Sequence, residues 1–197
     1  MAINDYFDRE IGRINNPERP IPRGAVAPNT VLGFSIVLFA IARVLAFMLP
    51  TLTTAIAVVN LVALVTYTEF FKGLPGMGNL LISYLGGSTF LFGAAAVGQL
   101  SASVVVLFLL AALSTFAREV IKDVEDLAGD REEGLQTLPI MIGRRPALGL
   151  AVAVLTVAVA ASPVPYLRAT FGLIYLVLVA PAVAVMLYSG YRSFEDP

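Results

Sequence analysis

Long uncharged apolar runs alternate with short polar segments along the whole chain. Each run has about the 17 to 25 residues with which a helix crosses the hydrocarbon of a bilayer. The six runs cover residues 26–49, 52–67, 79–97, 102–117, 146–161 and 169–188. Short turns are expected at Pro50 and over residues 98–103 and 162–165. The pattern therefore predicts an all-α integral membrane protein with about six transmembrane helices.

Composition supports lipid as the solvent and narrows the chemistry. Of the 197 residues, 58% are apolar and 14% are charged, whereas soluble proteins average about 45 to 50% apolar residues even when Gly is counted. The chain has neither Cys nor His, so disulfides, thiolate nucleophiles, zinc fingers and imidazole bases are excluded. Any catalysis must use carboxylates, amides, hydroxyls and cations.

The charges lie almost entirely on one side of the membrane when the six runs are threaded alternately. Only two of the thirteen cations, Arg43 and Arg168, fall elsewhere. The positive-inside rule makes this side cytoplasmic, in a multi-pass protein of the cell membrane. All fourteen acids lie there too. The orientation rule does not require the acids, so they indicate chemistry at this face. The alternative is that polar loops simply hold the charges that lipid excludes.

Two polar segments combine acids with helical spacing. In the first, residues 1–25, Asn4 and Asp8 are one turn apart on a helix and offset by about 40°, so that their side-chain oxygens can converge. Asp5 lies beside them, and Gly12 takes the next position on that face. This segment is the first candidate site.

The second segment, residues 118–145, contains three aspartates at spacing i, i+3 and i+7: Asp123, Asp126 and Asp130. On a helix they fall within about 60° of one another, with Glu119 close to the same face. Such stacked carboxylates repel by a few tenths of a kcal/mol per pair unless a cation lies among them.

Oxygen ligands without His or Cys favour Mg²⁺ or Mn²⁺, and Mg²⁺ held by one or two carboxylates commonly binds substrate phosphates. An EF-hand is excluded because its ligands alternate along a loop. The alternative is two solvated amphipathic helix starts beside a membrane. Two such segments on one face, surrounded by cations, favour the metal site.

Both acidic segments resemble the paired aspartate-rich motifs of the UbiA superfamily of intramembrane prenyltransferases. The first motif of that family reads N-D-x-x-D-x-x-x-D, and here Gly12 replaces its last aspartate; the second, D-x-x-D-x-x-x-D, is matched in full. Further stretches are similar to an archaeal ether-lipid branch of the family: AINDYFDREI, NNPERPIPRG, GNLLISYLGGSTFLFGAAAVG and REVIKDVEDLAGDREEGLQTLPI. Together they cover most of the chain.

The resemblance implies a bundle of nine transmembrane helices around a lateral cavity, with both motifs on cytoplasmic-side loops. Six helices are expected here, two more would precede the first motif, and one would follow Pro197. Residues 1–197 are therefore expected to be a fragment of a single prenyltransferase domain, incomplete at both ends. The alternative is a compact natural variant.

The resemblance also implies an activity: a geranylgeranyl group passes from geranylgeranyl diphosphate to geranylgeranylglyceryl phosphate, and diphosphate is released, in archaeal ether-lipid biosynthesis. The expected partners are these two substrates and membrane lipid, with no nucleic acid; the oligomeric state stays open.

Mg²⁺ is the implied cofactor. Its implied ligands are Asn4, Asp8, Asp126 and Asp130, with Asp5 and Asp123 as close supporting carboxylates, and Asp8, Asp126 and Asp130 are the implied catalytic residues. The implied diphosphate or phosphate contacts are Arg9, Arg19, Tyr67, Lys72 and Lys122.

Other interpretations stay open at this point. Gly12 removes one carboxylate and predicts weaker Mg²⁺ binding. One alternative is an aromatic acceptor, as in quinone or porphyrin pathways, and another is a non-catalytic remnant. An ion or lipid carrier is less favoured, because carriers place ionisable residues near mid-bilayer. Small residues such as Gly86, Gly87 and Gly93 predict close helix packing or a smooth wall beside an isoprenoid chain.

Overall fold

The computed structural model describes Tyr6, Arg9 and residues 17–71, 74–132 and 134–195. Every regular element in this described part is helical, which confirms the predicted all-α class. The chain forms two compact units, Met1–Pro50 and Thr51–Pro197, and each is described by itself.

The first unit contains one long helix, α3, over Pro28–Ala46. Pro28 starts it, because the fixed backbone angle of proline suits the first helical position and its missing N–H would have no partner there. Ser35 is its buried residue, and the Ser35 hydroxyl donates to the Val31 carbonyl oxygen at 2.9 Å. The large apolar side chains of α3 are exposed, as suits a helix surrounded by lipid.

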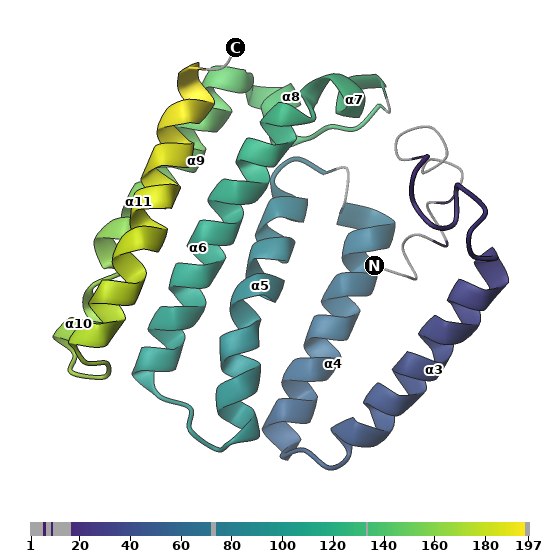
Figure 1. Cartoon of the computed structure of the whole chain (residues 1–197), viewed down its shortest axis with the longest axis horizontal. Helices are drawn as coiled ribbons and strands as arrows, with labels where there is room; N and C mark the ends of the chain where they lie inside the picture. Colours follow the sequence, from purple (N-terminus) through teal and green to yellow (C-terminus); the bar gives the residue numbers. More distant parts are fainter. Residues whose placement is uncertain (1–5, 7–8, 10–16, 72–73, 133, 196–197) are drawn as a thin grey trace. The chain divides into compact units, whose positions relative to one another are not determined.

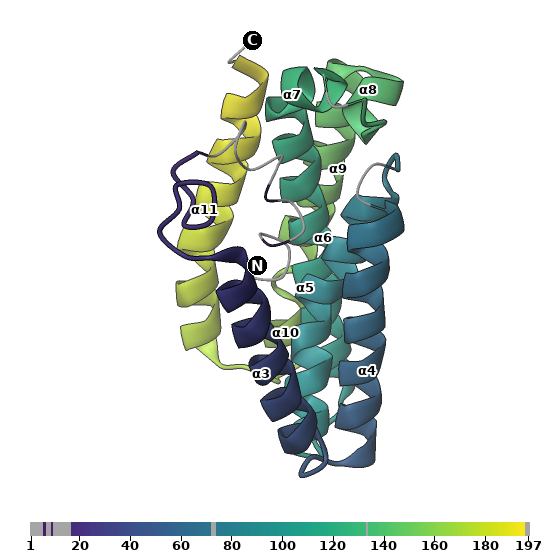
Figure 2. The ribbon, with the colours of Figure 1, turned by 90° about the vertical axis from the view of Figure 1, so that its right-hand side faces the viewer.

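The second unit is a row of packed helices. Its long members are α4 (Thr51–Thr66), α5 (Met77–Ala96), α6 (Ala102–Glu125), α9 (Arg144–Ala161) and α11 (Leu173–Glu195), and its short ones are η1 (Tyr67–Phe71), α7 (Leu127–Glu132), α8 (Leu138–Ile142) and α10 (Val164–Leu167). Each long helix packs against the next long helix in the chain (Figures 1 and 2). Consecutive elements are thus neighbours in space, as short turns require.

The predicted spans are recovered with differences at several boundaries, and the last one, expected over residues 169–188, is α11 over Leu173–Glu195. Five helices of the described chain are long and apolar enough to cross a membrane, and α4 is a sixth, shorter apolar helix of 16 residues. The helix α6, expected to end at residue 117, continues to Glu125, because Val120 and Val124 still fall on its buried face. The expected turn over residues 162–165 contains part of the short helix α10.

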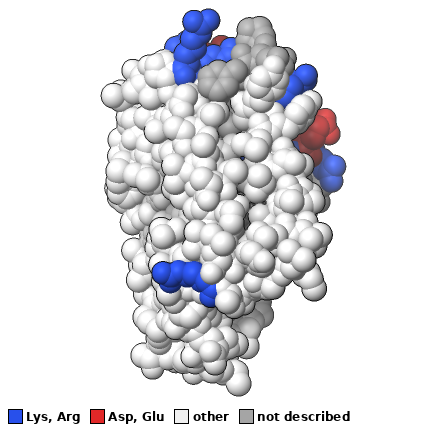
Figure 3. Space-filling model, turned by 90° about the vertical axis from the view of Figure 1, so that its left-hand side faces the viewer, with Lys and Arg blue, Asp and Glu red and all other residues white. Residues whose placement is uncertain are grey.

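The face of the molecule on the α11 side is mostly uncharged (Figure 3), as lipid contact requires.

The core of the second unit lies between α6 and α9. Its buried members are Ala117, Val120, Val124, Ala147, Leu148, Ala151 and Leu155. Three of them are alanines, and small residues let helix backbones approach closely in a membrane, where packing replaces the hydrophobic effect as the source of attraction. This core fixes the end of α6, which carries the second acidic segment.

Glycines bring α5 against α6. A Cβ atom on Gly87 would lie 2.6 Å from the Phe108 carbonyl oxygen, and one on Gly86 would lie 3.0 Å from the Thr115 hydroxyl oxygen. Both distances are shorter than ordinary contacts, so these glycines confirm the predicted packing role. A Cβ atom on Gly93 would meet no atom within 4 Å, so Gly93 makes no such contact.

Candidate functional site

The second acidic segment forms the end of α6 and the short helix α7. Asp126 lies at the junction of the two helices: its N–H donates to the Lys122 carbonyl oxygen at 2.9 Å, and its own carbonyl oxygen accepts from the Asp130 N–H at 3.0 Å. The helical turn therefore continues through the junction and keeps Asp126 and Asp130 one turn apart. Residues 118–145, expected as a loop, are mostly helical in the described structure.

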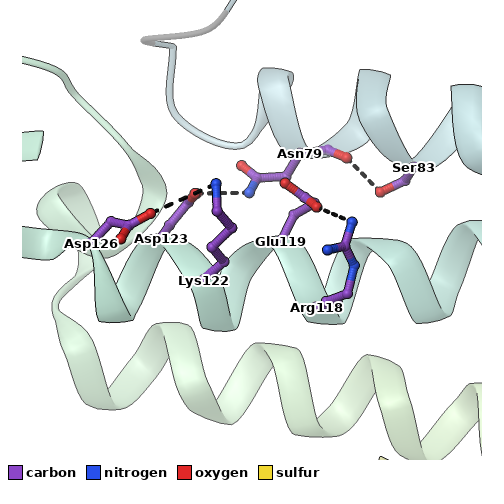
Figure 4. A network of polar contacts seen from close by, with 7 residues as sticks. All are labelled: Asn79, Ser83, Arg118, Glu119, Lys122, Asp123 and Asp126. Atoms are coloured by element: carbon purple, nitrogen blue, oxygen red, sulfur yellow. Dashed lines mark hydrogen bonds and ion pairs between the residues drawn. The ribbon is translucent and has the colours of Figure 1, made fainter. Parts of the chain in front are cut away.

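Asp123 points away from this turn, toward α5. The Asn79 side-chain amide donates to Asp123 Oδ2 at 2.7 Å (Figure 4). Asn79 is 7% exposed, and its backbone carbonyl oxygen accepts from the Ser83 hydroxyl at 2.5 Å. Asp123 is half-buried and lies within electrostatic reach of Glu119 and Asp130. One oxygen of Asp123 is thus committed to a neighbouring helix.

Two ion pairs lie beside Asp123 on the same helix end (Figure 4). Lys122 Nζ is 3.7 Å from Asp126 Oδ2, and more than half of each side chain is exposed. Such exposed pairs contribute about 0 to 1 kcal/mol, so Lys122 does not hold the Asp126 carboxylate firmly. Arg118 pairs with Glu119 at 2.5 Å. Asp126 is therefore the most accessible of the three motif aspartates.

The other expected site residues are placed less completely. Asn4, Asp5, Asp8, Gly12 and Lys72 lie outside the described residues. Their convergence with the second segment stays a prediction.

Three further expected phosphate contacts are described. The Arg9 guanidinium donates to the Tyr6 carbonyl oxygen at 3.1 Å and lies 5.1 Å from the centre of the Tyr6 ring. Tyr67 begins η1, directly after α4, and Arg19 is exposed in a turn of the first unit. Arg9 and Arg19 belong to one unit and Tyr67 to the other, so their grouping stays a prediction.

The donor chemistry of the second segment suits Mg²⁺. Its carboxylates are hard oxygen ligands, Asp126 is exposed and Asp130 is half-buried, and Mg²⁺ takes one or two carboxylates together with waters and phosphates. Among the residues that the structure describes, no three acidic side chains gather closely enough to hold a metal ion. A site of more than two carboxylates would therefore need ligands from elsewhere in the chain.

An apolar groove runs along α6 in the second unit. One cavity of about 260 Å³ lies among α5, α6, α9 and α11, and includes Phe90 and Tyr175 in its wall. A second cavity, of about 330 Å³, includes Arg118. The two share Ser114 and Met186. The groove therefore extends from the middle of the helices toward the helix end that carries the acids.

Sequence reasoning did not anticipate Asn79. It lies 44 residues from Asp123 in the chain, and its only signal was its place as the one amide at the start of an apolar run. A buried amide in such a run needs a hydrogen-bond partner, but the run itself does not show where that partner is.

Apolar spans, an acidic helix end with oxygen ligands only, and an apolar groove leading toward it define a membrane protein suited to lipid-like molecules with anionic heads. The UbiA prenyltransferase family matches residues 1–197, so the chain belongs to that family of membrane enzymes. This confirms the resemblance inferred from the two motifs.

Named relatives and solved structures agree with the family. The chain is 60% identical over 196 residues to a digeranylgeranylglyceryl phosphate synthase of Natronomonas pharaonis. The aligned region covers 100% of this chain and 71% of the relative. A solved chain from work on digeranylgeranylglyceryl phosphate synthase in membranes is 40% identical, with a TM-score of 0.77, over 100% of this chain and 70% of that one. A UbiA homologue of Archaeoglobus fulgidus bound to DMAPP and Mg²⁺ shares the fold, with 19% identity and a TM-score of 0.75 over 97% of this chain and 69% of that one.

Proposed function

We propose that this chain acts as a digeranylgeranylglyceryl phosphate synthase. The observation that carries the proposal is the 60% identity to a relative of that name over the whole chain. In the proposed reaction, the free hydroxyl oxygen of geranylgeranylglyceryl phosphate forms a bond to the allylic carbon of geranylgeranyl diphosphate. The bond from that carbon to the diphosphate breaks, diphosphate leaves, and the hydroxyl proton passes to a carboxylate or to the diphosphate itself.

The residues proposed for this reaction are the two acidic segments. When bound, Mg²⁺ supplies positive charge that offsets the charge developing on the departing diphosphate. The Archaeoglobus fulgidus homologue, whose structure contains DMAPP and Mg²⁺, supports the proposal that Mg²⁺ is the cofactor. The proposed ligands are Asn4, Asp8, Asp126 and Asp130, with Asp5 and Asp123 beside them.

The proposed cations and groove would orient the two substrates. Lys122 lies beside Asp126, where an ammonium group can bind a phosphate oxygen. The proposed partners of Lys122 in this role are Arg9, Arg19, Tyr67 and Lys72. The apolar groove along α6 has room for an isoprenoid chain and would keep it away from water. Eleven of the thirteen cations lie on the side of the membrane that carries both segments, and this asymmetry supports a cytoplasmic orientation of that side.

Acceptor choice is tested with labelled geranylgeranyl diphosphate offered with either geranylgeranylglyceryl phosphate or an aromatic quinone precursor. We expect label to appear in the glyceryl phosphate product alone, because the relatives are named for that product. Label in the aromatic product alone would favour the alternative acceptor. Absence of transfer to both would indicate a non-catalytic remnant.

Gly12 offers a separate prediction about the metal. The substitution Gly12→Asp restores the carboxylate that the family motif carries at this position, so the Mg²⁺ concentration for half-maximal transfer is expected to fall. Titration of prenyl transfer with Mg²⁺ measures it. Equal half-saturation in both proteins would show that this position does not contribute to metal binding.

A further inference from the structure

We infer that Asn79 is a positioning residue for the second acidic segment and thereby sets its affinity for divalent cations. The inference rests on the proposed function, because it assigns Asp126 and Asp130 to metal binding. It adds a residue of α5, outside both aspartate-rich motifs, to the machinery of the site.

The contact itself is short and buried. Asn79 Nδ2 lies 2.7 Å from Asp123 Oδ2, and Asn79 is 7% exposed. A half-buried carboxylate loses hydration, and a hydrogen bond to the charged form offsets that loss. Without the amide, Asp123 would favour a rotamer that reaches water.

Asn79 is itself held in place. It lies at the start of α5, where a Cβ atom on the preceding Gly78 would be 2.9 Å from the Phe71 carbonyl oxygen and 3.4 Å from the Tyr67 ring. The start of α5 thus packs tightly on η1, which carries Tyr67. The Ser83 hydroxyl also donates to the Asn79 backbone carbonyl oxygen within α5. The tightly packed start of α5 therefore presents the amide.

The effect reaches the metal segment through one helical turn. Val120 and Val124 fix the end of α6 in the core with α9, and the Asn79 contact fixes it from the side of α5. Asp126 follows Asp123 by three residues, and its carbonyl oxygen accepts from the Asp130 N–H. Holding Asp123 therefore limits the rotation of the turn that displays Asp126 and Asp130. Partners hydrogen-bonded directly to metal ligands typically change metal affinity by about 10- to 100-fold, so the lower end of this range is expected for a residue that acts through Asp123.

The test measures Mn²⁺ binding by electron paramagnetic resonance in detergent-purified protein, without substrates. Asn79→Ala is expected to weaken Mn²⁺ binding about tenfold. In protein that already carries Asp123→Ala, the amide has no carboxylate to hold, so the added Asn79→Ala substitution is expected to weaken Mn²⁺ binding by less than about twofold. Unchanged Mn²⁺ affinity in Asn79→Ala, or an equal loss in both backgrounds, would overturn the inference. Ser88→Ala is the matched control, since Ser88 is a buried residue of the same helix whose hydroxyl donates to the Leu85 carbonyl oxygen within that helix.

A second variant separates positioning from folding. The exchange N79D/D123N keeps one amide and one carboxylate at the two positions and moves the charge to α5. If Asn79 acts by position, the exchange folds and recovers Mn²⁺ affinity to within about threefold of the unmodified protein. Recovery of thermal stability without recovery of Mn²⁺ affinity would overturn the inference. Because the Mn²⁺ measurement is made without substrates, a lack of geranylgeranyl transfer by the unmodified protein would count against the proposed function alone.

Discussion

Replacing Asp126 with Asn is expected to lower the rate of geranylgeranyl transfer by about 100- to 1,000-fold, the usual effect of removing one group that stabilises developing charge. Asp126 is the most accessible aspartate of the second motif, with 56% of its side chain exposed. An amide of the same size keeps the shape of the side chain and removes the negative charge that a divalent cation needs. Single-turnover transfer of labelled geranylgeranyl diphosphate, followed at several Mg²⁺ concentrations, measures the effect.

The same substitution should leave the fold intact. The pair with Lys122 is exposed on both sides and spans 3.7 Å, so its loss should cost less than about 1 kcal/mol of unfolding free energy. Glu125→Gln is the matched control: it removes the charge of an exposed neighbouring acid of α6 and should leave the transfer rate within about twofold. Equal transfer rates for Asp126→Asn and the control would contradict the assigned role of Asp126.

Replacing Gly87 with Ala is expected to destabilise the protein by about 1 to 3 kcal/mol, the usual cost of adding a methyl group to a packed interface. The new Cβ would lie 2.6 Å from the Phe108 carbonyl oxygen and 2.9 Å from the Phe108 ring. A backbone oxygen cannot move aside like the end of a flexible side chain, so α5 and α6 must separate. Unfolding in increasing SDS, followed by circular dichroism, measures the loss.

Gly93→Ala is the matched control on the same helix. No atom lies within 4 Å of the position of its Cβ, and Ala is favoured over Gly in a helix by about 0.5 to 1 kcal/mol. The two substitutions are therefore expected to have opposite signs. Equal stability of both variants would show that the two helices do not pack as closely as the structure places them.

The apolar pattern predicted the spans because each span must satisfy its backbone hydrogen bonds internally, and only a helix does so in lipid. It misplaced the end of α6. Charged residues begin at Arg118, and a hydropathy pattern ends a span where charge begins, but the helix continues while its other face can be buried. Val120 and Val124 supply that face, and their partners Ala147 and Ala151 come from α9.

The acidic segments were predicted as candidate sites because spacing on a helix is a local property. The structure places Asp126 and Asp130 one turn apart as expected, and it turns Asp123 toward α5. That difference could not be predicted from spacing, which relates residues on one helix and carries no information on the helix beside it. The roles of the first segment stay predictions, because its motif residues Asn4, Asp5 and Asp8 lie outside the described residues.

The amino-acid sequence alone was sufficient to establish a membrane protein of apolar helices, chemistry limited to oxygen ligands and cations, and two acidic segments of the UbiA type. The first two properties follow from composition and from patterns within single helices, and the third follows from the resemblance of the two segments to the motifs of that family. The partnership of Asn79 with Asp123 and the close approach of Gly87 to Phe108 depended on the packing of separate helices. Such contacts join residues far apart in the chain, and their geometry arises only when whole helix faces fit together.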